Sequence, residues 1–190
     1  MSKGRLEAFS DGVLAIIITI MVLELDVPHE PTLAALLPLL PVFLSYILSF
    51  VFIGIYWNNH HHLLQATKQV NGSVLWANLF LLFWLSLTPF VTAWMGESGF
   101  ASWPVALYGG VLLMAAIAYF ILARTLVALQ GTDSPLAVAL GNDVKGKISP
   151  VIYLLAIPLA FVNPWISCTL YVLVAAMWLI PDRRIERTIS

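Results

Sequence analysis

The sequence predicts an all-α integral membrane protein, and three observations support this prediction. Hydrophobic residues make up 61% of the 190-residue chain and charged residues only 10%, whereas roughly 25% of the residues in a soluble domain are charged. Six apolar runs are each long enough, or nearly so, to cross about 30 Å of hydrocarbon. The runs are continuously apolar, unlike the alternating strands of a membrane barrel, so helices are the element that can satisfy their backbone in lipid.

The six runs predict a single six-helix membrane domain over residues 1–190. Pro89 lies inside the third run, and Pro158 lies inside the short fifth run. Pro104 suits the first turn of the fourth helix, where a backbone N–H has no helical partner. Only the Asn163–Pro164 turn separates the last two runs, so they form a hairpin. The approximate spans are residues 6–25, 33–57, 74–95, 103–123, 148–162 and 165–180.

The basic residues predict the orientation of the chain. All nine precede the first run, follow the last one, or lie in alternate loops, so both termini are expected in the cytoplasm under the positive-inside rule. The opposite loops are acidic, which raises the local cation concentration there. The basic residues are Lys3, Arg5, Lys68, Arg124, Lys145, Lys147, Arg183, Arg184 and Arg187, and the acidic ones are Glu24, Asp26, Glu30 and Glu97.

Several classes of function are not expected. The net charge of −1 argues against a nucleic-acid partner. The one cysteine, Cys168, provides neither a disulfide framework nor a cysteine zinc site. We find no glycine-rich phosphate loop, HExxH motif or nucleophile–base pair, so neither an enzyme nor a cofactor is expected. A Thr-Val-Gly-Tyr-Gly run is also absent, so the filter of a conventional potassium channel is not expected.

The first run carries the most informative polar residues. Asp11 lies near one end of this run, and an aspartate at bilayer depth is costly and commonly functional. At about 100° per residue, Ile16, Ile20 and Leu23 form one stripe with Thr19 at its edge, and Asp11 falls on the opposite face. Such a stripe faces lipid, packs on another helix, or lines a hydrophobic constriction that gates by dewetting.

Partners for Asp11 are expected after the second run, in the segment that contains Trp57 and three histidines. Adjacent histidines on a helix point about 100° apart, so they do not converge on one metal ion. We expect one histidine to donate to Asp11 or to pack near Arg5, while the others face the cytoplasm. The histidines are His60, His61 and His62.

The motif Arg5-x-x-x-Phe9-Ser10-Asp11, followed by Thr19 and by Leu23-Glu24-Leu25, resembles the lysosomal potassium channel family of the transmembrane protein 175 type. The stretch 57–62 and the Thr88-Pro89-Phe90 segment are also similar to bacterial members. The resemblance implies a potassium-permeable channel in a prokaryotic plasma membrane, without a pore loop.

The resemblance further implies that the first helix lines the pore and that four copies assemble around it. Ile16 matches the narrowest position, Ile20 and Leu23 continue the constriction, and Thr19 matches a neighbouring polar position. The resemblance also implies that the motif's arginine, serine and aspartate hold the pore helix in register.

Two other functions stay open from the sequence. One is a proton-coupled secondary transporter that uses Asp11 as its titrating group. Transporters commonly have inverted repeats and broken helices around a midplane site, and we detect neither pattern. The other is a membrane scaffold without transport activity.

Overall fold

The computed structural model describes residues 2–131, 134–141 and 143–179. Every regular element in these ranges is helical, which confirms the all-α prediction. Counting helices that continue one another as one segment, four segments are long and apolar enough to cross a membrane, and α8 is a shorter apolar helix. The elements are α1 (Lys3–Leu23), η1 (Leu33–Leu39), α2 (Leu40–Gln65), α3 (Gly72–Ser86), α4 (Thr88–Glu97), α5 (Ser102–Gln130), α6 (Pro135–Leu140), α7 (Val144–Leu159) and α8 (Pro164–Leu179).

The third apolar run is not one uninterrupted helix. It consists of α3 and α4, with Leu87 between them in a helical conformation at φ −82° and ψ −10°. Pro89 explains the break, because proline has no N–H to donate and its ring collides with the carbonyl of Leu85 four residues earlier. The two helices still form one apolar segment over Gly72–Glu97.

The other runs are helical with shifted ends. The second run begins as the 3₁₀ helix η1, which contains Pro38, and α2 then extends to Gln65, well beyond the expected end. The fourth run extends to Gln130 and ends at Gly131, whose φ of 93° favours glycine. The loop after α5 contains the short helix α6, whose N-cap Ser134 accepts a hydrogen bond from the backbone N–H of Ala137.

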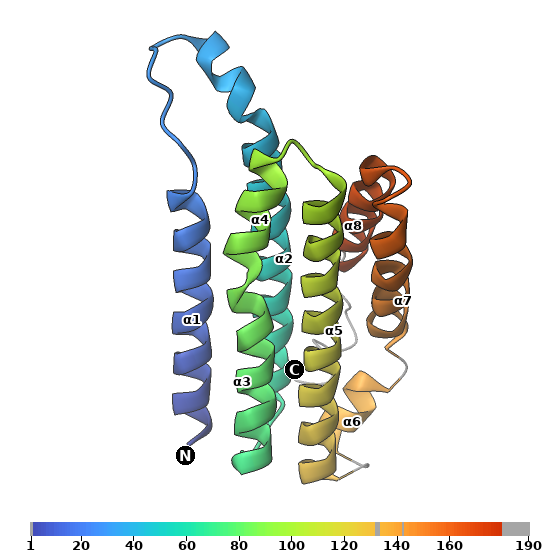
Figure 1. Cartoon of the computed structure of the whole chain (residues 1–190). Coiled ribbons are helices and arrows are strands. Elements are labelled where there is room, and N and C mark those ends of the chain that lie inside the picture. The colour runs from blue at the N-terminus through green and yellow to red at the C-terminus, as the bar shows by residue number, and fades with distance from the viewer. Residues whose placement is uncertain (1, 132–133, 142, 180–190) are drawn as a thin grey trace.

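The helices pack side by side, with α1 at one edge of the bundle (Figure 1). Helices α2, α3 and α4 contact α1. Helices α7 and α8 pack against each other and against α5. One buried apolar cluster joins α1, α2, α3 and α5, and a second joins α2, α4, α5, α7 and α8. Helices α2 and α5 belong to both clusters, so they connect the edge helix α1 to the far side.

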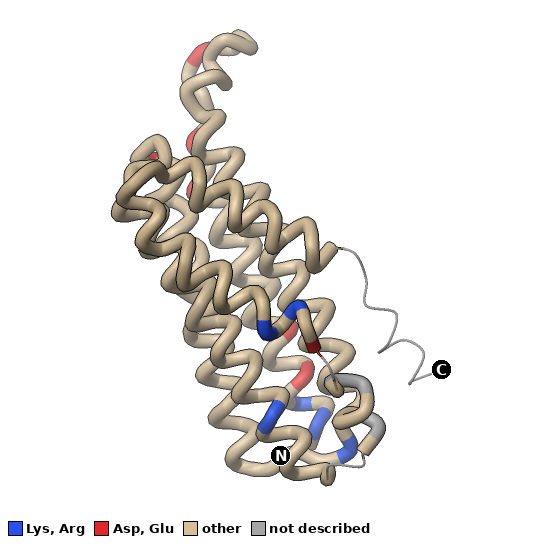
Figure 2. Tube along the Cα trace, turned by 90° about the vertical axis from the view of Figure 1, so that its right-hand side faces the viewer, with Lys and Arg blue, Asp and Glu red and all other residues tan. Residues whose placement is uncertain are grey.

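The charged residues are distributed unequally between the ends of the bundle. Figure 2 shows the described lysines and arginines toward the end that holds the N-terminus, whereas several acidic residues lie at the other end. Arg183, Arg184 and Arg187 lie outside the described residues. The six described basic residues therefore agree with the alternation expected from the sequence.

Candidate functional site

Helix α1 has one buried and one exposed face. Its buried residues recur every three or four positions, which is the spacing of one helix face, and they are Leu6, Ser10, Leu14, Ile17 and Met21. The predicted stripe lies on the other face, where the side chains of Ile16, Ile20 and Leu23 are 58%, 40% and 79% exposed. The neighbouring Ile17 is only 3% exposed. The exposed face must therefore meet lipid or another copy of the chain.

The exposed face of α1 also contains small and polar residues. Ala8, Gly12, Ala15 and Thr19 are all exposed, and a Cβ added at Gly12 would meet nothing within 4 Å. The Thr19 hydroxyl lies 3.1 Å from the carbonyl oxygen of Ala15 and 2.9 Å from that of Ile16. Because its proton is donated to its own helix, the hydroxyl oxygen keeps lone pairs that can accept from water or contact a cation.

A buried hydrogen-bond chain fixes the other face of α1. Ser10, Asn78 and His60 come from α1, α3 and α2, and each is at most 1% exposed. The Asn78 amide nitrogen donates to the Ser10 hydroxyl at 3.0 Å, and the Ser10 hydroxyl donates to the Leu6 carbonyl at 2.9 Å. His60 Nε2 lies 2.7 Å from Asn78 Oδ1. This nitrogen is the donor, because an amide oxygen can only accept.

The buried chain sets the rotation of α1 about its own axis. Each group in it would be costly to bury alone, by about 1–3 kcal/mol. A rotation that exposed the Ser10 side of α1 would break these bonds. The same rotation would bury the stripe, so the polar chain and the exposed stripe depend on one another.

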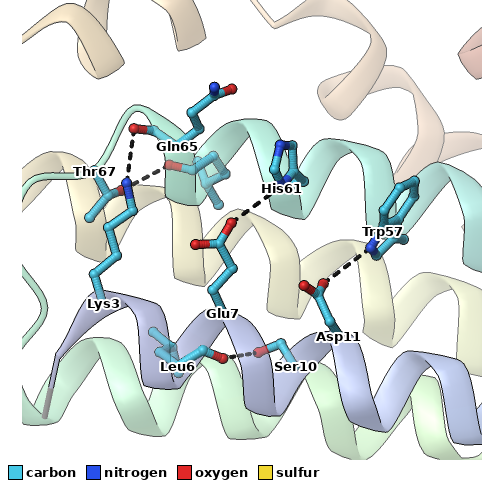
Figure 3. Close-up of polar contacts among 10 residues, drawn as sticks. Lys3, Leu6, Glu7, Ser10, Asp11, Trp57, His61, Gln65 and Thr67 are labelled. Atoms are coloured by element: carbon cyan, nitrogen blue, oxygen red, sulfur yellow. Dashed lines mark hydrogen bonds and ion pairs between the residues drawn. The ribbon is translucent and has the colours of Figure 1, made fainter.

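A second, more exposed set of contacts joins α1 to α2 (Figure 3). Lys3 Nζ donates to the carbonyl oxygen of Gln65 at 3.1 Å. Glu7 Oε1 lies 3.3 Å from His61 Nδ1, and Trp57 Nε1 donates to Asp11 Oδ1 at 3.1 Å. The residue numbers rise in steps of four along α1 and fall in steps of four along α2. We call these three contacts the antiparallel ladder.

The ladder corrects one prediction from the sequence. The partner of Asp11 is the Trp57 indole and not a histidine, although Trp57 lies in the segment expected to supply it. The indole N–H is a donor only, so it suits a carboxylate without needing a proton on an imidazole. The sequence also placed the unpaired histidines toward the cytoplasm, but His60 is buried because it completes the chain to Ser10.

The remaining predicted residues lie apart from these contacts. Arg5 is exposed, and its side chain makes no hydrogen bond or ion pair with any described residue. Phe9 is 51% exposed on the same side as the stripe. His62 contacts the His61 ring, and no hydrogen bond joins it to the motif within the described ranges. Among the described residues, Ser10 and Asp11 are the members of the motif whose side chains bond to other helices.

Sequence reasoning missed three residues whose side chains hold α1 against its neighbouring helices. It assigns no contact to Asn78, Lys3 or Glu7, although Asn78 is an amide within an apolar run, where it needs partners. The spacing of Lys3, Glu7 and Asp11 places them on one helix face, which is a signal in the sequence. Their pairing with α2 depends on the antiparallel register of two helices, which local spacing does not specify.

No group of three or more potential metal ligands occurs among the described residues. The ring nitrogen Nδ1 of His60 has no partner in the described part of the chain, and the same is true of His62 Nδ1. The arrangement around α1 therefore consists of a polar anchor on one face and an apolar strip with one hydroxyl on the other.

Comparisons with known proteins identify related channels. Residues 5–89 match the family described as the endosomal/lysosomal potassium channel TMEM175. A protein named as a potassium channel from Chryseobacterium sp. is 58% identical over 100% of this chain and 99% of its own length. Another so named, from Chamaesiphon minutus, is 32% identical over 86% of this chain and 87% of its own length.

A solved structure has a similar fold over nearly the whole chain. The crystal structure of a lysosomal potassium-selective channel TMEM175 homolog from Chamaesiphon minutus aligns with a TM-score of 0.79 at 30% identity. The alignment covers 94% of this chain and 96% of the other. These relatives are named as ion channels, which are not enzymes. The sequence matches and the shared fold together show that this chain belongs to the TMEM175 channel family.

Proposed function

We propose that this chain is a potassium-permeable cation channel in which four copies surround a pathway lined by α1. The observation that carries the proposal is the exposed strip of α1, which is continuous along the helix while the opposite face is fixed by buried polar bonds. Relatives over almost the full length of the chain are named potassium channels. A single copy has α1 at its edge (Figure 1), so a pathway along α1 requires further copies.

The strip has the chemistry of a hydrophobic constriction. Four copies of Ile16, with Ile20 and Leu23 one and two turns further along, would form apolar rings that exclude water when narrow. Thr19 supplies a hydroxyl oxygen beside these rings. A cation that loses part of its water shell at the rings would find this oxygen next to it, which is the second feature that supports permeation along α1.

We further propose that the chain spans the plasma membrane of a prokaryote six times, with both termini cytoplasmic and without a pore loop. The segment formed by α3 and α4 counts as one span, and α7 and α8 form a hairpin of two shorter ones. The gathering of described basic residues at one end supports this orientation. Bacterial relatives of nearly equal length support the location.

The contacts around Asp11 do not favour the alternative of a proton-coupled transporter. Such a carrier would need Asp11 to exchange protons with a transport pathway. Asp11 instead accepts from Trp57 on the side of α1 that faces α2, away from the exposed strip. The channel proposal uses Asp11 as an anchor, which is the role its contact supports.

Single-channel recording of the purified protein in planar bilayers tests the proposal. We expect discrete unitary currents that reverse near the potassium equilibrium potential when potassium is the main cation. Slow, saturable flux coupled to protons in a fixed ratio, without unitary currents, would contradict a channel and support the carrier.

A matched pair of variants tests the assignment of the strip. Ile16→Asn places a polar amide in the proposed constriction, so we expect conductance to rise severalfold and the preference for potassium over sodium to weaken. Ile47→Asn makes the same change on the exposed face of α2 and should leave conductance unchanged in channels that assemble. Equal currents from Ile16→Asn and the unaltered protein would count against Ile16 as the constriction.

A further inference from the structure

An elongated cavity lies on the opposite side of the bundle from the exposed strip. It has a volume of about 290 Å³ and is bounded by α2, α5, α7 and α8, with α6 near one end. Helices α7 and α8 are separated from α1 by α5 (Figure 1). The cavity is therefore distinct from the polar anchor and the strip of α1.

The cavity changes character along its length. Its inner part is lined by apolar and aromatic side chains, including Phe52, Ala116 and Tyr153. Its other end is lined by Arg124, Asp143 and Lys147. The α5 residues that line it run from Ala116 to Val127, which corresponds to about 16 Å at 1.5 Å per residue. The cavity is therefore long, largely apolar and polar at one end.

The charged side chains at the polar end include an arginine that a ligand can reach. The Arg124 guanidinium lies 5.1 Å from the centre of the Phe120 ring, and it is paired with no acidic side chain among the described residues. Asp143 is engaged elsewhere, because its carboxylate accepts the backbone N–H of Gly146 at 2.9 Å and caps α7. The exposed Lys147 adds a second positive charge.

We propose that this cavity binds one acyl chain of an anionic phospholipid, whose phosphate lies against Arg124. The occupant is a lipid because the apolar inner part suits hydrocarbon and the polar mouth lies at the basic end of the bundle. The lipid is anionic because basic pockets between membrane helices at that end bind acidic head groups. The volume accommodates part of one chain, and the rest of the lipid stays in the surrounding bilayer. This inference does not depend on α1 lining a pore.

Native mass spectrometry of the full-length protein tests the proposal with phosphatidylglycerol and phosphatidylcholine of identical chains. We expect the unaltered protein to retain phosphatidylglycerol in preference, with one lipid per chain. Arg124→Gln should weaken that binding about fivefold, as expected for the loss of one basic residue near an anionic lipid surface. Lys68→Gln is the matched control, because Lys68 is an exposed basic residue that does not line the cavity. Equal weakening by both variants would overturn the site, since it would show a general attraction to basic residues.

A second variant tests the acyl-chain part. Ala116→Phe fills the inner cavity and should abolish preferential phosphatidylglycerol retention while Arg124 is intact. Its thermal unfolding, measured without added phosphatidylglycerol, reports whether it is folded. Retention of the lipid by folded Ala116→Phe would overturn the proposal. Displacement of the lipid by millimolar inorganic phosphate would also overturn it, because the site would then recognise a free anion and not a lipid.

Discussion

Helices α1 and α2 both present uncovered faces, but the two faces differ in side-chain size and polarity. Only 28% of the residues in the apolar stretch of α1 are buried within the chain. In the segment that contains α2, 22% of the apolar stretch is buried. The exposed face of α1 combines aliphatic residues with alanine, glycine and threonine. The exposed face of α2 carries large apolar residues, including Phe43, Ile47, Phe50 and Trp57.

Exposure alone therefore does not distinguish the proposed pore-lining face from a face that meets lipid. Small residues allow helices in a membrane to approach closely, and an exposed hydroxyl offers an oxygen to a cation. Bulky aromatic side chains instead suit contact with acyl chains and, at the interface, with head groups. We therefore assign the α1 face to contacts between copies around the pathway and the α2 face mainly to lipid.

The largest effect is expected from breaking the buried hydrogen bonds that fix the rotation of α1 about its own axis. Asn78→Leu keeps the side-chain volume but removes both bonds of the Asn78 amide, which leaves the buried His60 N–H unpaired. We expect the free energy of unfolding to fall by about 3 kcal/mol, measured by thermal unfolding in detergent. Asn58→Leu is the matched control, because Asn58 is exposed, and it should change stability by less than about 0.5 kcal/mol.

Equal stability of Asn78→Leu and Asn58→Leu would mean that the buried chain does not fix α1. The rotation of α1 would then be set by its buried apolar residues and by the antiparallel ladder alone.

A large difference is also expected in chemical accessibility. In a Cys168→Ser background, Ile16→Cys should react with a water-soluble, charged thiol reagent applied to open channels, and the reaction should block most of the current. Ile47→Cys on the α2 face lies in lipid in this assignment and should leave the current unchanged. Block through Ile47→Cys but not through Ile16→Cys would reverse the assignment of the two faces.

A smaller effect is expected from removing the hydroxyl of the α1 face. Thr19→Val keeps the shape of the side chain, and we expect the permeability ratio of potassium to sodium to fall a few-fold as measured from reversal potentials. Thr125→Val in α5 is the control, because the Thr125 hydroxyl also donates to a carbonyl four residues earlier. Identical ratios in the two variants would show that permeating ions do not use the Thr19 oxygen.

The smallest effect is expected from the antiparallel ladder. Glu7→Gln removes the carboxylate that lies 3.3 Å from Nδ1 of the 42% exposed His61, and the two side chains form an ion pair when the imidazole is protonated. Exposed pairs contribute about 0–1 kcal/mol, so we expect a shift of that size in the free energy of unfolding, decreasing at high salt. A loss above about 2 kcal/mol would mean that the ladder anchors α1 as strongly as the buried chain does.

The helical class and the positions of the apolar segments were predictable from the sequence. Long apolar runs in lipid must satisfy their backbone internally, so composition and run length determine the type of element. The break at Leu87 was not predicted, although Pro89 was seen, because a proline in an apolar run either kinks a helix or ends it. The stripe was also predictable, since the 3.6-residue period alone places Ile16, Ile20 and Leu23 together. Its exposure within one chain came from the tertiary structure.

The partners of α1 were decided by the tertiary structure. Local spacing places Asp11 away from the stripe, but it does not select Trp57 over the histidines that follow it. That choice depends on the antiparallel register of α1 and α2 and on the depth at which α3 brings Asn78 beside Ser10. The sequence by itself determined which residues share a face of each helix, because helical periodicity is local. Only packing determined which faces meet, because contacts between helices depend on their register and rotation.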